Sequence, residues 1–465
     1  MGKEASWYRV PGLVFDLLST AQALIAADTV SHKGTAPAVE VLRPLYEAAG
    51  LTVDIQEELK HGVRQQNLLG TFQGSDRAGL LLVTHLDTVD PGPPEMWTQT
   101  GGAPHKLTRH GDALYGLGTA DTKLDALCKL TAAAEWKGRT LRRSIQLLGT
   151  FEEEVGTKGA QHFVSTPAFQ ARYVACSEPS ELTLIRAHKG YAVVRIELYL
   201  PEPRLLEGPF ERLTLDGKAA HSSTPHLGVN AIEKACALLG QGPLLSLEAG
   251  SVANKVPARA TLVRPHPGAG APLSEGSAPP DLRDATATLA LSRELFSLWS
   301  RLALAQRPEQ NLAFDPSRCV VNWGVARIAG ARAELTFDCR LLPGHDPRAL
   351  TTTFTREAVE LGRARGALRV EVEVERSNPA KELKEPSVLL DAARAACRAV
   401  GLDDTPAAKP TNTEAGVFAA AGVESIVFGP GRSTGNAHCA NEHNLYPQLL
   451  KAIEFYRALI HQLCA

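Results

Sequence analysis

The sequence has almost no surplus of charge, no long apolar run and no closely spaced pair of cysteines. Its 49 Lys and Arg residues nearly balance its 51 Asp and Glu residues, for a net charge of −2. This balance gives no reason to expect a nucleic-acid or membrane partner. No segment reaches about 18 consecutive apolar residues, and the start of the chain lacks a signal-peptide pattern, so we expect no transmembrane helix.

The eight cysteines occur at irregular spacings and include no Cys-x-x-Cys pair. Several of them lie in apolar runs, where a free cysteine behaves as a small hydrophobic residue. This use of cysteine favours a reducing compartment over a disulfide scaffold, so we expect a cytoplasmic protein.

The length of 465 residues exceeds what one ordinary core can organise, so two domains are expected. The first part alternates strands with helices, which predicts an α/β sheet with a site along the carboxyl edge of its strands. From Lys189 the pattern becomes that of a separate α+β domain, and after about Ala380 the α/β pattern returns. We therefore predict that residues 189–380 form a domain inserted between residues 1–188 and 381–465.

The apolar run Leu80 to Val83 predicts a buried strand that ends at His85 and Asp87. Residues two apart share one face of a strand, so both side chains point the same way. A metal-binding histidine is often oriented by a carboxylate that accepts a hydrogen bond from its other ring nitrogen. Taken alone, the pair also fits two polar residues of a surface loop.

More acidic and imidazole side chains follow the other predicted strands of the same sheet. They are Asp121, Glu153, Glu154, Glu178 and His438. Two imidazoles with several carboxylates suit divalent metals, above all zinc. Of two adjacent glutamates, one can bind a metal while its neighbour takes a proton from water. The alternative for the acidic run is a solvated surface turn.

These segments resemble the co-catalytic zinc amidohydrolases and metallopeptidases that include acetylornithine deacetylase, succinyl-diaminopimelate desuccinylase, aminoacylase and glutamate carboxypeptidase. The matching pieces lie in the same order along nearly the whole chain: His85-Leu-Asp87, Gly116-Leu-Gly-Thr-Ala-Asp121, Glu153-Glu154-Val-Gly156, Glu178-Pro179-Ser180, His188-Lys189-Gly190, Ala220-His221-Ser222-Ser223-Thr224-Pro225 and Phe428-Gly429-Pro430-Gly431 leading to His438. The resemblance implies a zinc-peptidase-like mixed sheet flanked by helices, with an inserted α+β lid or dimerisation domain.

The resemblance also implies a role for each residue of the cluster, with two Zn²⁺ per subunit and Co²⁺ or Mn²⁺ as possible replacements. Asp121 would bridge the two metals. His85 and Glu178 would complete one metal site, and Glu154 and His438 the other. Glu153 would be the general base, and Asp87 would orient His85. The peptide bond between Asp121 and Thr122 is a candidate for a rare cis bond without proline.

In the inserted domain the resemblance points to His221, Arg340 and Asn254. His221 would stabilise the oxyanion, commonly from the other subunit of a dimer. Arg340 would bind the carboxylate of the substrate. Asn254 stands well before the position of the family's substrate-binding asparagine, so it either takes that role from another strand or belongs to a structural turn. The domain is enlarged around residues 243–318, which leaves a monomer as the alternative to a homodimer formed through the lid.

The most direct reading is a two-metal hydrolase that cleaves the amide bond of an N-acyl amino acid. Glu414, where many relatives carry aspartate, looks more like acetylornithine deacetylase than like the peptidases. The alternative is a dipeptidase or carboxypeptidase with the same machinery. A non-catalytic metal-dependent binding protein is a further possibility, although every ligand and the expected base are present. The expected partner is a small N-acyl amino acid or dipeptide.

Overall fold

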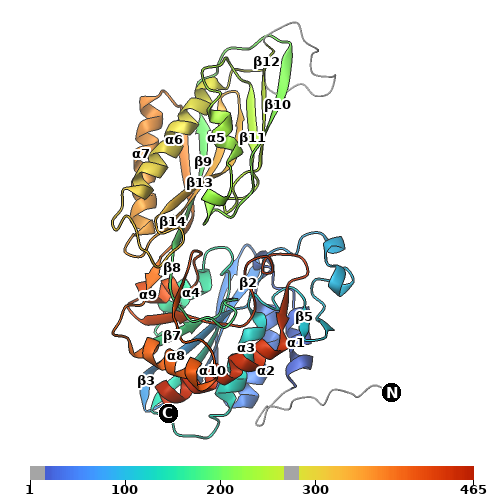
Figure 1. Ribbon diagram of the computed structural model, residues 1–465, viewed down its shortest axis with the longest axis vertical. Coiled ribbons are helices and arrows are strands. Elements are labelled where there is room, and N and C mark those ends of the chain that lie inside the picture. The colour runs from blue at the N-terminus through green and yellow to red at the C-terminus, as the bar shows by residue number, and fades with distance from the viewer. Residues whose placement is uncertain (1–15, 267–281) are drawn as a thin grey trace. The chain divides into compact units, whose positions relative to one another are not determined.

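A computed structural model describes residues 16–266 and 282–465 of the chain (Figure 1). The chain divides into two compact units. Unit 1 contains the described residues up to Ala187 together with Lys381–Ala408 and Thr413–Ala465, and unit 2 contains His188–Ala380 and Lys409–Asn412. The predicted fold class, an α/β domain with an inserted α+β domain, is confirmed.

Unit 1 is built on a nine-stranded mixed sheet with the order β1-β2-β6-β3-β7-β18-β8-β16, in which β17 also pairs with β8. The strands are β1 (Thr52–Lys60), β2 (Val63–Phe72), β3 (Asp76–His85), β6 (Arg143–Thr150), β7 (Tyr173–Cys176), β8 (Ile185–His188), β16 (Lys381–Glu382), β17 (Ala407–Lys409) and β18 (Glu424–Val427). Strand β3 runs parallel to both β6 and β7, and β18 runs parallel to β7. Their carboxyl ends therefore meet at one edge of the sheet.

Helices cover both faces of this sheet. They are α1 (Leu17–Ala26), α2 (Ala36–Ala49), α3 (Lys123–Ala134), α4 (Lys158–Val164), α8 (Val388–Ala399), α9 (Ala415–Ala420) and α10 (Tyr446–Cys464). Leu80 and Leu82 of β3 pack in the core that contains α3 and α10. Leu81 and Val83 pack in the core that contains α4 and α9. The strand is buried on both faces, which explains why its sequence is continuously apolar rather than alternating.

Short elements complete unit 1 at the margin of the main sheet. They are the small sheet of β4 (Thr108–His110), β5 (Ala113–Tyr115) and β19 (His443–Leu445), and the 3₁₀ turns Ser31–Lys33, Pro94–Met96 and Thr98–Thr100. Because β5 pairs with β19, the segment before Asp121 is held beside the segment that follows His438.

Unit 2 is a seven-stranded antiparallel sheet with the order β10-β12-β11-β13-β14-β9-β15. Its elements are β9 (Gly190–Tyr199), β10 (Phe210–Asp216), a 3₁₀ turn (Pro225–Leu227), α5 (Ala231–Cys236), β11 (Ser246–Ala249), β12 (Arg259–Pro265), α6 (Thr286–Leu304), β13 (Val320–Ala329), β14 (Arg332–Leu341), α7 (Pro347–Ala364) and β15 (Arg369–Asn378). Trp299 of α6 packs edge-on against Phe354 of α7, with ring centroids 5.1 Å apart. Trp323 and Phe337 of the sheet belong to the same aromatic cluster, and their ring centroids are 5.4 Å apart.

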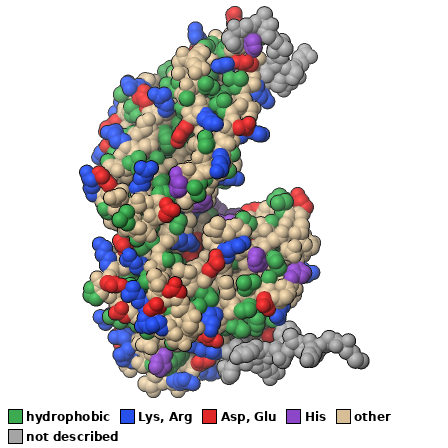
Figure 2. Space-filling view, viewed as in Figure 1, with side chains coloured by type: hydrophobic (Ala, Val, Ile, Leu, Met, Phe, Trp, Pro, Cys, Tyr) green, Lys and Arg blue, Asp and Glu red, His purple; other side chains and the backbone are tan. Residues whose placement is uncertain are grey.

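Figure 2 shows basic and acidic side chains intermingled over the visible face of the protein. Within residues 16–266 and 282–465, no helix combines the length and apolarity needed to cross a membrane.

Candidate metal centre

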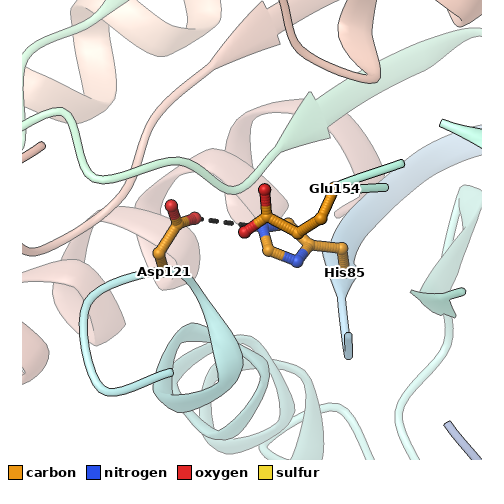
Figure 3. A group of neighbouring side chains, drawn as sticks. All are labelled: His85, Asp121 and Glu154. Atoms are coloured by element: carbon orange, nitrogen blue, oxygen red, sulfur yellow. Dashed lines mark hydrogen bonds and ion pairs between the residues drawn. The ribbon is translucent and has the colours of Figure 1, made fainter. Parts of the chain in front are cut away.

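The carboxyl edge of the unit 1 sheet gathers side chains from one strand end and two loops. His85 is the last residue of β3, Asp121 precedes α3, and Glu154 follows β6. One ligand atom from each of these three residues lies within 4.8 Å of the other two. Figure 3 shows the three side chains converging on one point.

Asp121 lies between two imidazoles. Its Oδ1 is 3.1 Å from Nε2 of His85, and its Oδ2 is 3.1 Å from Nε2 of His438. His438 Nε2 is also 3.0 Å from Glu154 Oε1. One carboxylate thus presents one oxygen to each of two imidazoles.

The charges of the cluster fit a cation-binding site. Burial opposes ionisation of Asp121, but hydrogen bonds from His438 and His85 hold its pKa well below the usual range. Burial also disfavours the charged form of His85, yet the bond to Asp121 and the nearby charges keep its pKa well above the usual value. Imidazole nitrogens and carboxylate oxygens are the donor types that zinc, cobalt and manganese accept. The residues present therefore fit divalent metal ions.

Glu153 is buried beside these groups. Burial raises its pKa well above the usual value, and the charges of Glu178, Glu154 and Glu414 add to this effect, while His85 opposes it. Glu178 is likewise buried and follows β7 by two residues. Such crowding of carboxyl groups is costly unless cations or protons offset it. A carboxyl group with a raised pKa is suited to exchanging protons with a substrate near neutral pH.

The carboxylate of Asp87 has a different set of contacts from the one predicted. His85 Nδ1 lies 3.0 Å from the main-chain oxygen of Asp87 and 3.8 Å from its carboxylate. The carboxylate instead accepts the backbone N–H groups of Glu153 at 3.0 Å and Glu154 at 3.2 Å, and the hydroxyl of Ser31 at 2.7 Å. The ring of His85 therefore bonds to the main chain of Asp87, and the Asp87 carboxylate lies farther away. Asp87 therefore holds the paired glutamates in place.

Two buried residues of this edge, Glu442 and Ser31, have structural contacts that sequence reasoning missed. Glu442 accepts the backbone N–H groups of Ala120 at 2.8 Å and Asp121 at 3.0 Å, and burial raises its pKa to about 7. Burial likewise raises the pKa of Glu414 to about 7. Glu442 follows His438 by four residues in the same polar loop, and Ser31 lies in a polar turn. These positions are the sequence features that could have identified the two residues. The peptide bond Asp121–Thr122 is cis, which confirms the expectation from the family resemblance.

Unit 2 places the segments that carry its three predicted site residues next to one another. The backbone N–H of Ser222 donates to the carbonyl of Asn254 at 2.9 Å, and His221 forms a β-bridge with Lys255. Arg340 Nη2 approaches the Ser222 hydroxyl at 3.4 Å. The cluster is therefore one of neighbouring segments, joined through Ser222, within this unit.

The hydrogen bonds of His221 fix the position of its proton. Its Nδ1 accepts the backbone N–H of Ser223 at 3.1 Å and lies 2.7 Å from the Ser223 hydroxyl. A backbone N–H can only donate, so Nδ1 carries no hydrogen and the neutral ring has its hydrogen on Nε2. His221 is thus a hydrogen-bond donor through Nε2.

Arg340 is almost fully buried, at 3% relative exposure. Its guanidinium lies 3.5 Å from the ring centroid of Tyr191 and 4.0 Å from the carboxylate of Asp338. A long contact of 3.5 Å joins it to Asn412. Among the described residues its Nε has no hydrogen-bond partner, so the side chain retains donor capacity for an anion.

Comparisons with known proteins agree with this arrangement. The model of peptidase family M20/M25/M40 matches residues 81–462. Acetylornithine deacetylase of Vibrio vulnificus is 34% identical over 221 residues, which are 47% of this chain and 50% of that protein. Acetylornithine deacetylase of Aliivibrio salmonicida is 35% identical over 223 residues, again 47% and 50%. The chain thus spans about half the length of the curated relatives it matches.

Solved structures match over a longer range at lower identity. Aminoacylhistidine dipeptidase from Vibrio alginolyticus has a TM-score of 0.66 at 14% identity and covers 99% of both chains. A metallo-carboxypeptidase from Sulfolobus solfataricus has a TM-score of 0.62 at 18% identity, over 96% of this chain and 99% of that one. At these identities the likeness concerns the fold.

Proposed function

The chain belongs to peptidase family M20/M25/M40, and on that premise we propose that it cleaves the amide bond of an N-acyl amino acid. The observation that carries the proposal is the placement of Asp121 between His85 and His438, with Glu153 buried nearby. The acetylornithine deacetylases among its sequence relatives support an acyl group on the substrate nitrogen. The peptidases among its structural neighbours favour the second candidate, a dipeptidase or carboxypeptidase.

We assign the ligands of two metal ions from the donor set. Asp121 would bridge both ions, His85 and Glu178 would hold one, and Glu154 and His438 would hold the other. Zn²⁺ is the default by ligand type, with Co²⁺ or Mn²⁺ as replacements. When bound, the ions would supply Lewis-acid chemistry that polarises the substrate carbonyl and makes water a nucleophile at neutral pH.

Glu153 is the proposed general base. Its carboxylate accepts a proton from the attacking water and then delivers that proton to the nitrogen of the leaving amine. A strongly raised pKa supports both steps, because the group must gain and lose a proton near neutral pH. Asp87 keeps the base in position through the backbone N–H groups of Glu153 and Glu154.

The cluster in unit 2 is proposed to recognise the substrate. His221 donates from Nε2 to the oxyanion that develops on the carbonyl oxygen. Arg340 binds the α-carboxylate, and Asn254 contributes polar contacts to the substrate. We further propose a homodimer formed through this unit, in which His221 serves the site of the partner subunit, with a monomer as the alternative.

The substrate class is tested by incubating the zinc-loaded protein with a panel of N-acyl amino acids and dipeptides and identifying products by mass spectrometry. Release of free amino acids from the N-acyl compounds supports the deacylase. Cleavage of dipeptides alone identifies the second candidate. If neither set is cleaved while two metals are bound, the catalytic proposal is wrong.

The roles of Glu153 and His221 are tested separately. Glu153→Ala should retain both metals and lose activity by roughly 10⁴-fold, whereas activity near the wild-type level contradicts the base assignment. His221→Ala should lower kcat with metal content unchanged. Mixing the two variants should restore part of the activity if His221 acts across a dimer. No recovery in a verified heterodimer excludes action in trans.

A further inference from the structure

A second cluster of buried polar side chains in unit 1 lies next to the metal-ligand edge and is centred on Lys129 of α3. Lys129 and Asp125 have relative exposures of only 2% and 3%. The ammonium of Lys129 lies 2.5 Å from the carbonyl oxygen of Val83, 3.1 Å from the hydroxyl of Thr84, 2.5 Å from the hydroxyl of Ser177 and 3.3 Å from the carboxylate of Asp125. One cation thus contacts β3, the end of β7 and its own helix.

Hydroxyl groups close this cluster into a network. Ser177 donates to Asp125 Oδ2 at 2.5 Å, and the hydroxyls of Ser177 and Thr84 are 2.9 Å apart. Tyr456 of α10 donates to the same carboxylate oxygen at 2.6 Å. Two helices, α3 and α10, therefore anchor a set of side chains that joins two strands of the sheet.

The network acts at a particular position along the strands. Strands β3 and β7 pair in parallel as far as Val83 and Cys176, and the backbone N–H of Ser177 then donates to the Val83 carbonyl at 2.8 Å. The next residues along the two chains are His85, after Thr84, and Glu178, after Ser177. The side chains of Thr84 and Ser177 therefore link the two strands at the point where backbone pairing ends. Each of them lies one residue before a proposed ligand.

Stability alone is a poor explanation for this network. A buried ion pair gains little over apolar side chains of similar volume, because removing both charges from water is costly. Ligand orientation is a better explanation, because outer partners commonly fix the direction of the groups that bind a metal. The network touches the two strands that carry His85 and Glu178, which are assigned to the same ion.

We propose that Lys129 and Asp125 are positioning residues that hold His85 and Glu178 at the spacing required by one of the two metal ions. This inference rests on the proposed function, since it takes from it the assignment of both ligands to one ion. It predicts an asymmetric effect: loss of the network weakens one metal ion and leaves the other unchanged.

The test measures metal binding rather than turnover. Metal-free full-length protein is titrated with Co²⁺ while its visible absorption is followed, and with Zn²⁺ in competition with a chromophoric chelator. The variants are Lys129→Met, which removes the cation, and Ser177→Ala, which removes one hydroxyl and tests the network with a smaller change. Lys381→Met is the matched control, because Lys381 is equally buried in unit 1, at 3%, and binds the carbonyl of Ser425 in β18.

We expect the affinity for one equivalent of metal to fall about 10- to 100-fold in both Lys129→Met and Ser177→Ala. The second equivalent, and both equivalents in Lys381→Met, should be unchanged. Unchanged binding of both equivalents in the folded variants overturns the proposal, and so does equal weakening of both. If Lys129→Met does not fold, Ser177→Ala decides the question.

The outcome separates this inference from the proposed function. Wild-type protein that binds two ions but cleaves no substrate contradicts the function, and the asymmetric loss in the variants still supports the positioning role. Wild-type protein that cleaves substrate, with variants that bind both ions normally, contradicts only the positioning role. Wild-type protein that binds fewer than two ions overturns both.

Discussion

Lys129 in unit 1 and Arg340 in unit 2 are both buried in polar clusters, and the two cations are partnered very differently. Lys129 in unit 1 has a carboxylate at 3.3 Å and three oxygen acceptors between 2.5 and 3.1 Å. Arg340 in unit 2 has a carboxylate at 4.0 Å and two hydrogen bonds no shorter than 3.4 Å. Its closest neighbour is the face of the Tyr191 ring.

The difference separates a cation whose hydrogens are all used within the protein from one that is suited to a ligand. An ammonium group has three hydrogens, and the contacts of Lys129 use all of them. A guanidinium has five, and those of Arg340 are only weakly used, although burial lowers the pKa of Arg340 and makes its charge costly to keep. A carboxylate from a substrate would offset that cost.

Replacing Lys129 by Met should have the largest effect on stability. The change leaves the carboxylate of Asp125 buried without its cation, which typically costs about 3–5 kcal/mol of unfolding free energy. Arg340→Met should cost much less, because its charge is poorly offset in the folded protein. Calorimetry of the metal-free variants compares the two. Equal destabilisation would contradict the distinction between the two cations.

Arg340→Met should instead reduce turnover. We expect kcat/KM for a substrate with a free α-carboxylate to fall about 100-fold, or roughly 3 kcal/mol of transition-state stabilisation. The matched control is the same substrate with its carboxylate converted to an amide. If Arg340 binds that group, the amide is a poor substrate for both proteins and the variant causes little further loss. An equal fold-loss on both substrates would place Arg340 in another role.

The two clusters also show what the sequence could and could not predict. The position of His85 was predictable because a short apolar strand and the residues at its end are local features. The α/β sheet and the inserted domain followed from the order of such features along the chain, whereas the mixed character of the sheet was implied by the family resemblance. The metal roles of all five residues, His85, Asp121, Glu154, Glu178 and His438, stay predictions.

The Lys129 network had no local signal. Helix α3 is buried along its whole length, so its charged residues do not mark a solvent face. Its partners Thr84, Ser177 and Tyr456 are distant in the sequence and become neighbours only through the parallel sheet. The backbone partners of the Asp87 carboxylate were not predicted for a related reason, since they lie more than 60 residues away. The long helix α6, within the enlarged region, was not predicted at all.

Asp338, the carboxylate beside Arg340, should make unit 2 sensitive to pH. Burial raises its pKa from 3.8 to about 6, and Arg340 only partly opposes this. A raised folded-state pKa means that the contribution to stability is full below about pH 3.8 and is lost as the pH rises through about 6. Relative to Asp338→Asn, wild-type protein should lose about 2 kcal/mol of unfolding free energy between roughly pH 4 and 6. A difference that stays constant over this range would show that Asp338 does not titrate there.

The smallest expected effect concerns the tyrosine in each cluster. Tyr456 contacts its cluster through the hydroxyl, which donates to Asp125 at 2.6 Å, whereas Tyr191 contacts Arg340 through the face of its ring. Tyr456→Phe removes a hydrogen bond to a carboxylate and should cost about 1.5 kcal/mol. Tyr191→Phe keeps the ring and should change stability by less than about 0.5 kcal/mol. Thermal unfolding of both variants measures the pair. A larger loss of stability in Tyr191→Phe than in Tyr456→Phe would mean that Tyr191 acts through its hydroxyl and not through its ring face. That result would contradict the distinction drawn between the surroundings of Arg340 and Lys129.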